Sequence, residues 1–434
     1  MKPAAPQVLS VFEAVAGGPL PLRVRCWDES TAGPPSARVA VVFRNRRALR
    51  RILWSPGELG LARAYVSGDL GVEGDLFELL EGPDVVERVA RRDLRTFGLH
   101  EVAHFASTFL RLGAIGPPPR PPELEVARRR GSKHSKARDA AVVSHHYDVG
   151  NDFYRLILGP SMVYSCGYWA RGEGGSLEDA QYDKLDLVCR KLRLRPGMRL
   201  LDVGCGWGAM PIHAARYYGV SAVGVTISRR QHDLARTLVA EAGVADRVEI
   251  RLQDYRDVRD GPYDAISSIG MSEHVGDRQL NAYTAGMAAL LRPEGRLLNH
   301  AISSIAPLVE SRHAAPTFTD RYIFPDGELL PLSRILDGLE HAGLETRDCE
   351  ALREHYASTL RHWVANLQRE WAPAVRLVGA PRARTWLLYL TASALAFERG
   401  RIGVNQVLAV RPGERGASGL PRTRGEWLGP DGSG

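Results

Sequence analysis

The sequence predicts an α/β protein with a doubly wound, mostly parallel sheet, preceded by a smaller N-terminal α+β domain. From about Arg199 onward, short apolar runs alternate with helical patterns of roughly ten to fifteen residues. This alternation is typical of parallel strands whose connecting helices cover both faces of a sheet. The chain also has 434 residues, which is too long for one average domain. We therefore expect two domains.

Composition and charge predict where the chain divides. Residues 113–122 contain five prolines and two glycines, and such a segment continues neither a helix nor a central strand. Residues 1–140 carry 22 Lys+Arg against 16 Asp+Glu, a net charge of +6 out of +7 for the whole chain. Many of these basic side chains lie in two runs, at 38–51 and 128–138. We predict an N-terminal basic domain at 1–112, a Pro-rich and basic linker at 113–139, a catalytic domain at 140–411 and a flexible tail at 412–434.

The individual elements follow from hydrophobic periodicity. In the N-terminal part we expect an amphipathic stretch at 8–15, a strand at 39–43 and helices at 59–66 and 76–89. In the second domain we expect strands at 200–204, 222–226, 248–252, 263–269 and 296–302, with helices at 209–218, 229–242 and 280–291.

Cysteine usage and hydropathy narrow the class of protein. The five cysteines are scattered without a CxxC pair, which argues against a disulfide framework or a structural zinc site and fits a reducing cytoplasm. We expect no metal. The N-terminus lacks a secretory signal pattern, and the longest apolar stretch, 386–397, is too short to cross a bilayer. Residues 386–397 are therefore predicted to form a buried helix, and the protein is predicted to be cytoplasmic.

A glycine-rich loop, DVGCGWG at 202–208, follows the first strand and opens a helix. Its glycines allow a tight turn and a close approach to a ligand, as βα turns do at the carboxyl ends of parallel strands. The GxGxG spacing alone leaves NAD and S-adenosylmethionine open. Two features favour S-adenosylmethionine: no acid ends the second strand, where Thr226 stands, and a helix stop with a turn at 290–296 precedes the fifth strand.

Ser228 and Gln231 allow two interpretations. Ser-x-x-Gln at the start of a helix forms a capping box, which needs no ligand. The same side chains would also face the adenosine of a cofactor bound at the glycine loop. Both interpretations stay open from the sequence.

Nine segments in order resemble one family, the cyclopropane-fatty-acyl-phospholipid synthases, which include the mycolic acid cyclopropane synthases. They extend over roughly two thirds of the chain, and the whole chain is most similar to an actinobacterial subgroup. The resemblance implies a Rossmann-like class I methyltransferase fold, and the N-terminal third looks like the extra domain of the longer members. The segments are HHYDVGNDFY (145–154), MVYSCGYW (162–169), LDVGCGWG (201–208), GVTIS (224–228), QDYRD (253–257), IGMSEHVG (269–276), HAI (300–302), RYIFPDG (321–327) and HYASTL (355–360).

The resemblance implies transfer of the methyl of S-adenosylmethionine to the cis double bond of an unsaturated phospholipid acyl chain. A bound bicarbonate then deprotonates the resulting carbocation, giving a cyclopropane. The alternative product is a mid-chain methylene branch, which would imply a reductase partner. The implied bicarbonate cage consists of Glu273, His300 and Tyr356, with Cys166 and Ile302 acting mainly through their backbone. Burial of Glu273 against acyl carbon would raise its pKa.

The resemblance also implies the remaining site residues, each at the position that matches the family's motifs. The implied cofactor contacts are Tyr164, Ser165, Asp202, Gly204, Cys205, Gly206, Trp207, Gly208, Thr226, Ile227, Ser228, Gln231, Asp254 and Tyr255. Aromatic faces stabilise a cation, and the expected substrate tunnel contains Tyr147, Tyr168, Trp169, Ser272, Tyr322 and Phe324. Ser272 departs from the family pattern, which often has Phe there, and so leaves the product open.

The basic runs suggest where the substrate is met. They suit the anionic inner face of a membrane, at about 1 kcal/mol per Lys or Arg near the surface, although a solvated basic face or a nucleic-acid surface carries the same composition. A nucleic-acid methyltransferase would have an Asn/Asp-Pro-Pro-aromatic motif after the fourth strand, where this chain has SIGMSEH at 268–274. A non-catalytic lipid sensor would have lost the cage residues. We therefore expect a peripheral membrane enzyme that binds phospholipid and no nucleic acid, with a homodimer as one alternative assembly.

Overall fold

The computed structural model describes residues 2–81, 99–126, 133–136, 138–139, 142, 149–305 and 317–428. Contacts between residues divide the chain into two compact units. The first consists of Met1–Arg129, Arg312–Pro325 and Trp371–Leu395; the second consists of Arg130–Ser311, Asp326–Glu370 and Ala396–Gly434. The predicted division was sequential, whereas two later segments belong to the first unit.

The first unit contains a four-stranded sheet in the order β2-β1-β3-β4. β1 and β3 are parallel and the other neighbours are antiparallel, so this unit is the predicted α+β domain. The strands are β1 (Arg23–Cys26), β2 (Thr31–Ala32), β3 (Ala40–Phe43) and β4 (Leu70–Glu73). The helices are α1 (Ala4–Ala16), α2 (Arg47–Trp54), α3 (Glu58–Val66), α4 (Leu76–Glu81), α6 (Leu99–Arg111), α13 (Phe318–Tyr322) and the part of α16 (Trp371–Glu398) up to Leu395. The predicted helix at 76–89 is described only as far as Glu81.

Segments distant in sequence complete the interior of the first unit. Ala62 and Val66 of α3 pack in one buried cluster with Phe318 and Tyr322 of α13, with Tyr389 of α16 against it. The backbone N–H of Phe318 also donates to a carboxylate oxygen of Glu58, at 3.0 Å. Residues 386–397 are helical, as predicted. No helix in the described ranges is long and apolar enough to span a membrane.

The second unit is built on a seven-stranded sheet in the order β10-β11-β9-β8-β5-β6-β7. Neighbours from β9 to β7 are parallel, and β11 is antiparallel to both β9 and β10. This is the predicted doubly wound, mostly parallel sheet. Its strands are β5 (Arg199–Val203), β6 (Ser221–Thr226), β7 (Val248–Leu252), β8 (Tyr263–Ile269), β9 (Leu291–Ser304), β10 (Glu345–Ala351) and β11 (Ile402–Val410). β10 and β11 were not predicted, and β9 begins five residues before the predicted strand at 296–302.

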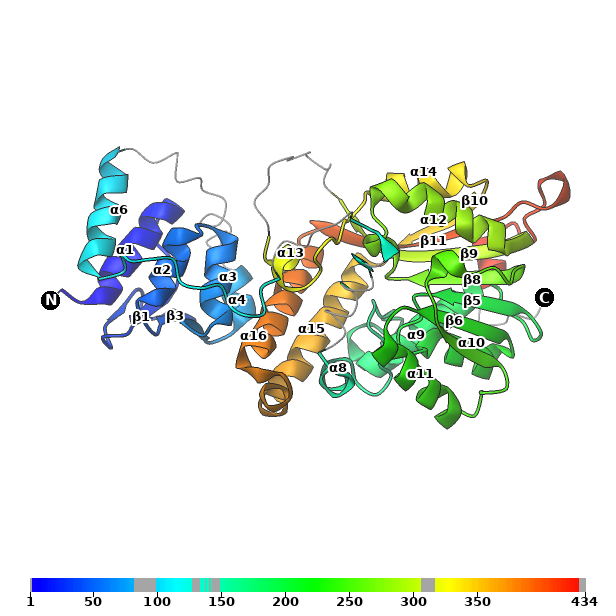
Figure 1. Ribbon diagram of the computed structural model, residues 1–434, viewed down its shortest axis with the longest axis horizontal. Helices are drawn as coiled ribbons and strands as arrows, with labels where there is room; N and C mark the ends of the chain where they lie inside the picture. Colours follow the sequence, from blue (N-terminus) through cyan, green and yellow to red (C-terminus); the bar gives the residue numbers. More distant parts are fainter. Residues whose placement is uncertain are drawn as a thin grey trace. The chain divides into compact units, whose positions relative to one another are not determined.

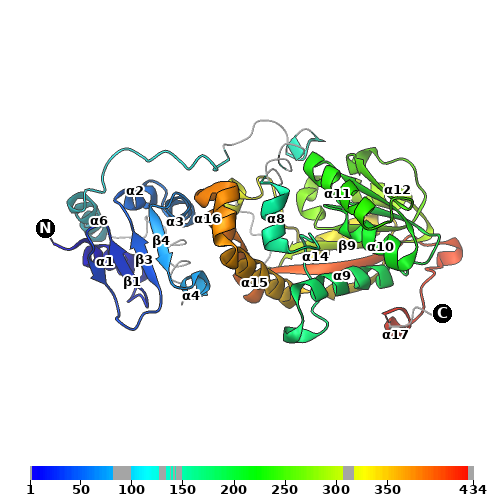
Figure 2. The ribbon, with the colours of Figure 1, turned by 90° about the horizontal axis from the view of Figure 1, so that it is seen from below.

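Helices cover both faces of this sheet. Figure 1 shows α12 (Asp277–Leu290) and α14 (Leu332–His341) on one side, with α9 (Leu177–Lys191), α10 (Ala209–Tyr218) and α11 (Arg229–Glu241) on the other, and Figure 2 shows the latter three in front of the strands. Two buried clusters fill these layers, because alternate strand residues point to opposite faces. Leu200 of β5 packs with the α9, α10 and α11 layer, and Leu201 with the α12 and α14 layer. α8 (Asn151–Leu158) packs against α15 (Arg353–Arg369).

The described part of the predicted flexible tail, residues 412–428, makes defined contacts with the rest of the second unit. Arg296 donates from Nη2 to the carbonyl of Gly419 at 2.9 Å. Arg424, at the start of α17 (Arg424–Leu428), forms an ion pair with the buried Asp348 of β10. These contacts hold Gly419 and Arg424 against the seven-stranded sheet.

Candidate active site

The glycine loop takes the conformation that its sequence requires. Gly204, Gly206 and Gly208 have φ angles of 77°, 55° and 87°, a region that favours glycine. Gly208 ends the loop as the N-cap of α10. On neighbouring β6, a side chain at Gly224 would place its Cβ 2.9 Å from Cβ and Sγ of Cys205. The loop therefore lies directly against β6, with its backbone N–H groups at the carboxyl edge of the sheet.

A cavity opens at this edge, and most of the predicted cofactor contacts line it. These lining residues are Tyr164, Ser165, Asp202, Gly204, Cys205, Gly206, Trp207, Thr226, Ile227, Gln231, Asp254 and Tyr255. Gly208 and Ser228 are not among the lining residues. Ser228 instead caps α11, with its hydroxyl accepting the Gln231 N–H at 3.3 Å. The side-chain oxygen of Gln231 accepts from the hydroxyl of Thr226 at 2.8 Å, and Gln231 lines the cavity. Ser228 therefore caps the helix as the first interpretation expects, and the contact of these side chains with the adenosine stays a prediction.

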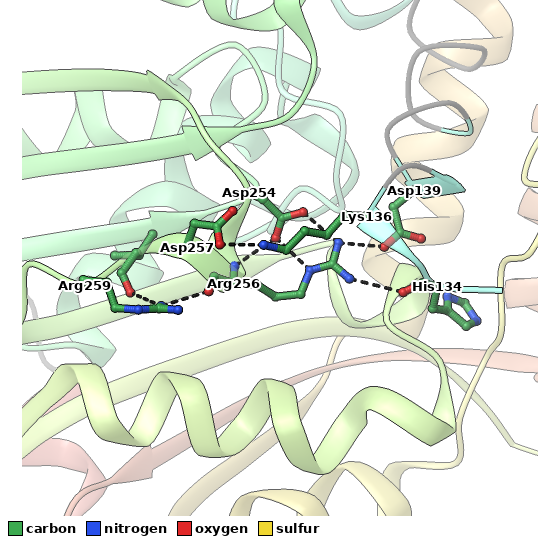
Figure 3. A network of polar contacts seen from close by, with 8 residues as sticks. His134, Lys136, Asp139, Asp254, Arg256, Asp257 and Arg259 are labelled. Atoms are coloured by element: carbon green, nitrogen blue, oxygen red, sulfur yellow. Dashed lines mark hydrogen bonds and ion pairs between the residues drawn. The ribbon is translucent and has the colours of Figure 1, made fainter. Parts of the chain in front are cut away.

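An ion-pair network, which sequence reasoning missed, borders the same cavity (Figure 3). The guanidinium of Arg256 donates to the carboxylates of Asp254, at 2.7 Å, and Asp139, at 2.9 Å, and to the backbone carbonyl of His134, at 3.2 Å. Burial alone would raise the pKa of Asp254, but the hydrogen bonds from Arg256 hold it below its usual range. Arg256 was visible in the motif at 253–257, yet its partners Asp139 and His134 come from a segment over a hundred residues earlier, which no local pattern indicates.

Glu273, a residue of the predicted cage, lies on the short 3₁₀ helix η4 (Ser272–His274), which follows β8 after two residues. Its Oε1 accepts the backbone N–H of Ile302 at 2.7 Å. Its Oε2 is buried and has no hydrogen-bond partner among the described residues. Burial raises the pKa of Glu273 to about 7. This carboxylate therefore has an acceptor oxygen left for a ligand.

His300 presents the complementary atom, two residues before Ile302 on β9. The side-chain amide nitrogen of Gln406, the residue paired with it on β11, lies 3.2 Å from its Nδ1. An amide nitrogen only donates, so Nδ1 accepts and the ring hydrogen is on Nε2. This Nε2 is buried with no partner in the described part of the chain. Burial lowers the pKa of His300 to about 3, so the ring is a neutral donor.

Contacts with the Leu352 carbonyl connect the Cys166 thiol and the backbone N–H of Tyr356 to the same region. The N–H of Leu352 donates to the carbonyl of Val404 at 2.8 Å, and Val404 is paired with Ile302. The carbonyl of Leu352 accepts the N–H of Tyr356 at 3.1 Å and lies 3.7 Å from the Cys166 thiol. Burial raises the pKa of that thiol far above its ordinary range, so it stays protonated.

Comparison with known proteins decides the family. A sequence profile described as "Mycolic acid cyclopropane synthetase" matches residues 134–407, well over half of the chain. The chain belongs to this family. It is 43% identical over 429 residues, covering 96% of both chains, to a probable fatty acid methyltransferase of Mycobacterium tuberculosis. It is 35% identical over 382 residues to the cyclopropane-fatty-acyl-phospholipid synthase of Escherichia coli K12, covering 88% of this chain and 90% of that one.

A solved structure shows the cofactor class of this cyclopropane synthetase family. The crystal structure of the mycolic acid cyclopropane synthase CmaA1, complexed with SAH and CTAB, is 35% identical with a TM-score of 0.59. The match covers 62% of this chain and 98% of that one. The present chain is thus an S-adenosylmethionine-dependent methyltransferase that acts on lipid acyl chains. Among the residues described here, no group of three or more His, Cys, Asp or Glu side chains is arranged to hold a metal ion.

The predicted tunnel residues of this family member belong to both units. Tyr168 stacks on His355 of α15 at 4.9 Å, and the Trp169 indole donates to the His355 carbonyl at 3.0 Å. Ser272 is buried beside Glu273. Tyr322 and Phe324 belong to the first unit, and Tyr147 lies outside the described residues. The Tyr322 hydroxyl donates to the Glu125 carboxylate at 3.1 Å, which is a structural role within that unit.

Two aromatic residues that the prediction missed pack beside the cofactor cavity, and one of them, Trp363, also contacts Tyr356 of the predicted cage. The Tyr154 ring lies 4.9 Å from Trp207 and 5.6 Å from Tyr164. The buried Trp363 ring lies 5.4 Å from Tyr164 and 6.0 Å from Tyr356. Both occur in segments similar to the cyclopropane synthetase family or next to them, but their contacts arise from α8 and α15, which are separated by about two hundred residues.

Several basic side chains of the two runs are used within their own units. Arg51 and Arg47 pair with the buried Asp69, at 2.8 and 3.1 Å. Lys136 pairs with Asp257 at 2.5 Å, and Arg138 pairs with Asp326 at 2.6 Å. Residues 128–130 lie outside the described residues. The net charge of these runs therefore overstates the positive charge that is left for a partner.

Proposed function

We propose that this protein transfers the methyl of S-adenosylmethionine to the cis double bond of an unsaturated phospholipid acyl chain, and that a bound bicarbonate takes up the released proton as a cyclopropane forms. The observation that most directly supports this proposal is that two buried polar atoms, Oε2 of Glu273 and Nε2 of His300, have no hydrogen-bond partner among the described residues. A buried polar atom without a partner is costly. The two atoms are one acceptor and one donor, which suits a small anion that carries its own proton.

The alkene chemistry explains why the site needs an anion rather than a strong protein base. The cofactor supplies an electrophilic methyl, and the π electrons of an alkene attack it without prior deprotonation. The new C–C bond leaves a cation on the acyl chain, and loss of one proton from the added methyl closes the ring. Glu273 accepts the proton of the bound bicarbonate and so strengthens it as a base, while the His300 Nε2–H donates to it.

The proposed phospholipid substrate rests on the similarity to the Escherichia coli synthase, whose name specifies a fatty-acyl phospholipid. The relative from Mycobacterium tuberculosis is named only as a probable fatty acid methyltransferase, which specifies the transfer but no ring. The methylene-branched product therefore remains the second candidate. It shares every step up to the cation and differs only in which proton leaves, and it would call for a reductase acting afterwards.

Features of the first unit support docking on an anionic membrane. Trp54 and Ile115 are 56% and 53% exposed, and the Trp54 indole donates to the carbonyl of Gly116 at 2.9 Å, which brings the two residues together. Arg46 and Arg50 lie over the same turn. The Nη1 atom of Arg46 is 3.1 Å from the position that a Cβ would take on Gly113, and the Nη1 atom of Arg50 is 2.9 Å from that position on Gly116. Tryptophan and basic side chains together are typical of membrane–water interfaces. We propose that this Trp54–Ile115 surface meets the inner leaflet.

Product analysis tests the proposed function. Purified protein is incubated with S-adenosylmethionine and vesicles of a cis-monounsaturated phospholipid, and the fatty acid methyl esters are analysed by mass spectrometry. A gain of one CH₂ that resists mild hydrogenation supports the cyclopropane. A gain that takes up hydrogen supports the methylene branch, and no gain with cofactor bound contradicts the phospholipid substrate. Turnover that does not respond to removal and restoration of bicarbonate contradicts the cage.

A further inference from the structure

Lys184 is a buried charge in the cofactor cavity to which neither the motifs nor the family comparison assigns a role. It lies on α9, is 1% exposed and lines the cavity. Its ammonium nitrogen donates to the hydroxyl of Ser165 at 3.0 Å. An ammonium group has three N–H donors, and the hydroxyl of Ser165 satisfies one of them.

Lys184 has no carboxylate within ion-pair distance among the residues that the structure describes. Asp202, at the end of β5, is also buried, lines the same cavity and has no cationic partner in those ranges; it accepts only the Ser267 hydroxyl, at 2.6 Å. Burial lowers the pKa of Lys184 to about 8 and raises that of Asp202 to about 6. Both groups are therefore charged near neutral pH, although a buried charge is stable only when it is paired.

A second lysine on the same helix provides the comparison. Lys191 lies seven residues further along α9 and is 0% exposed, but its ammonium pairs with Asp348 at 3.2 Å and with Glu350 at 2.5 Å. It does not line the cavity. The fold thus satisfies one buried ammonium internally and leaves the other facing the cofactor cavity.

We propose that Lys184, together with the Ser165 hydroxyl, binds the α-carboxylate of S-adenosylmethionine and thereby selects cofactors that carry this group. The methionine end of the cofactor is a zwitterion, with one carboxylate and one ammonium. A buried ammonium and a buried carboxylate that line one cavity without pairing with each other are complementary to it. In this arrangement Asp202 faces the cofactor ammonium and Lys184 faces the carboxylate.

The test compares two ligands rather than activities. S-adenosylhomocysteine and its decarboxylated analogue differ only in the α-carboxylate, and calorimetry gives the affinity of each for wild type and for Lys184→Met. A charge-assisted contact corresponds to roughly 10- to 100-fold in affinity. We expect wild type to prefer S-adenosylhomocysteine by this factor. Lys184→Met should lose the preference because it binds S-adenosylhomocysteine more weakly and the analogue about as well as wild type does.

Lys191→Met is the matched control, because it removes a lysine of equal burial from the same helix but should keep the ligand preference. Equal affinity of wild type for both ligands would overturn the proposal, and that measurement needs no variant. A preference that persists in Lys184→Met would overturn it as well. If that variant does not fold, Lys184→Gln replaces it in the same comparison. Ligand binding without lipid separates this result from any failure of the proposed acyl substrate.

Discussion

Buried polar side chains of this protein fall into two groups that differ in how completely the fold satisfies them. Asp69 is 2% exposed but accepts hydrogen bonds from Asn45, Arg51 and Ser67. Burial alone would raise its pKa, yet those hydrogen bonds hold it below its usual range. Glu273 is similarly buried, has one backbone hydrogen bond, and has its pKa raised to about 7. The first carboxylate is satisfied within the fold, whereas the second keeps one oxygen, Oε2, without a partner among the described residues.

Substituting Glu273 separates cofactor binding from turnover. We expect Glu273→Gln to bind S-adenosylhomocysteine as wild type does but to lose about 100-fold or more in turnover, the usual size of a general-base contribution. In wild type, activity should fall as the pH drops through about 7, because the carboxyl of Glu273 is then protonated and no longer accepts a proton. Calorimetry and radiolabelled methyl incorporation across pH check both results.

The same variant has a stability test with an internal control. Because the folded state favours the protonated form of Glu273, its ionisation makes wild type less stable as the pH rises from the ordinary pKa of 4.5 toward about 7. Glu273→Gln should therefore melt at a higher temperature than wild type at pH 8, with a smaller difference at pH 5. Near-wild-type turnover in this variant would contradict the cage.

Gln406 acts through His300 rather than on the substrate. Its amide donates to Nδ1 and holds the ring hydrogen on Nε2. We expect Gln406→Leu to lower turnover by about 10-fold or more and to leave the affinity for S-adenosylhomocysteine unchanged. The reason is that losing the hydrogen bond that orients the His300 ring costs about 1.4 kcal/mol or more. Nitrogen NMR of His300 should show a mixture of tautomers in the variant.

The neighbouring amide provides a control for that prediction. Asn405 is buried on the adjacent position of β11 and donates to the hydroxyl of Ser303 at 2.8 Å. Asn405→Leu should lower the melting temperature but keep the turnover and the tautomer of His300. Equal losses of turnover in the two variants would mean that Gln406 supports the sheet and does not orient the ring.

At the scale of the elements, the ends of the parallel strands position the residues of the candidate site. β5, β6 and β8 end at one edge of the sheet, where Thr226 is the last residue of β6 and the glycine loop and Glu273 follow the ends of β5 and β8. α9 contributes from one face of the sheet, and β9 with β11 brings His300 and Gln406 together in register. Parallel strands concentrate functional residues at this edge because every loop at their carboxyl ends emerges there.

A methyl group at Gly224 should disturb the cofactor loop from the neighbouring strand. Its Cβ would lie 2.9 Å from Cβ and Sγ of Cys205, a contact closer than van der Waals packing allows. We expect Gly224→Ala to lower the melting temperature and to weaken S-adenosylhomocysteine binding by about 10-fold, corresponding to about 1–3 kcal/mol of overpacking. Thermal melting and calorimetry measure the two effects.

Gly286 of α12 serves as the matched control for that substitution. It is exposed, in a helix, and a Cβ there meets nothing within 4 Å. Gly286→Ala should stabilise the protein by up to about 1 kcal/mol through helix propensity, with no effect on cofactor binding. Unchanged cofactor affinity in Gly224→Ala would show that the loop is not held by β6.

At the level of the whole molecule, the first unit is assembled from three separate stretches of chain. Phe318 and Tyr322 close the cluster around Ala62 and Val66, and α16 contributes Tyr389. The mutual burial of these apolar side chains makes the N-terminal part dependent on residues that follow most of the second unit in sequence. The two units therefore cannot be separated by a single cut.

Expression of residues 1–129 alone tests this dependence. The fragment lacks α13 and α16, so Ala62 and Val66 lose their cover. We expect it to aggregate or to bind a hydrophobic dye strongly, because exposed apolar surface of this kind promotes association. In the full chain, Phe318→Ser should lower the melting temperature. A monomeric fragment that unfolds cooperatively would contradict the prediction.

The proposed membrane docking is tested on the intact chain. Trp54→Ser with Ile115→Ser should reduce sedimentation with phosphatidylglycerol vesicles by about 10-fold or more, because two large apolar side chains are removed from the proposed interface. Tyr217→Ser is the control, since Tyr217 is 52% exposed but lies in the second unit. Equal sedimentation of the double variant and wild type would place the lipid surface elsewhere.

Much of the catalytic unit was predictable because its determinants are local. The glycine loop, the five parallel strands and the ordered motifs around Glu273 and His300 each occupy a short stretch of sequence. β10 was missed because it is a mostly exposed edge strand without an apolar run, and β11 because its antiparallel place between β9 and β10 depends on a distant partner.

The sequence by itself identified the family through its ordered motifs, and hydrophobic periodicity predicted the five parallel strands and the cofactor loop, because each of these signals lies within a short stretch of chain. Only the tertiary structure decided which buried charges have partners. Lys184 and Lys191 are two lysines on one helix, and nothing in their local sequence separates them, yet one is paired with carboxylates and the other faces the cofactor cavity. The physical reason is that the energy of a buried charge depends on groups that approach it from distant parts of the chain.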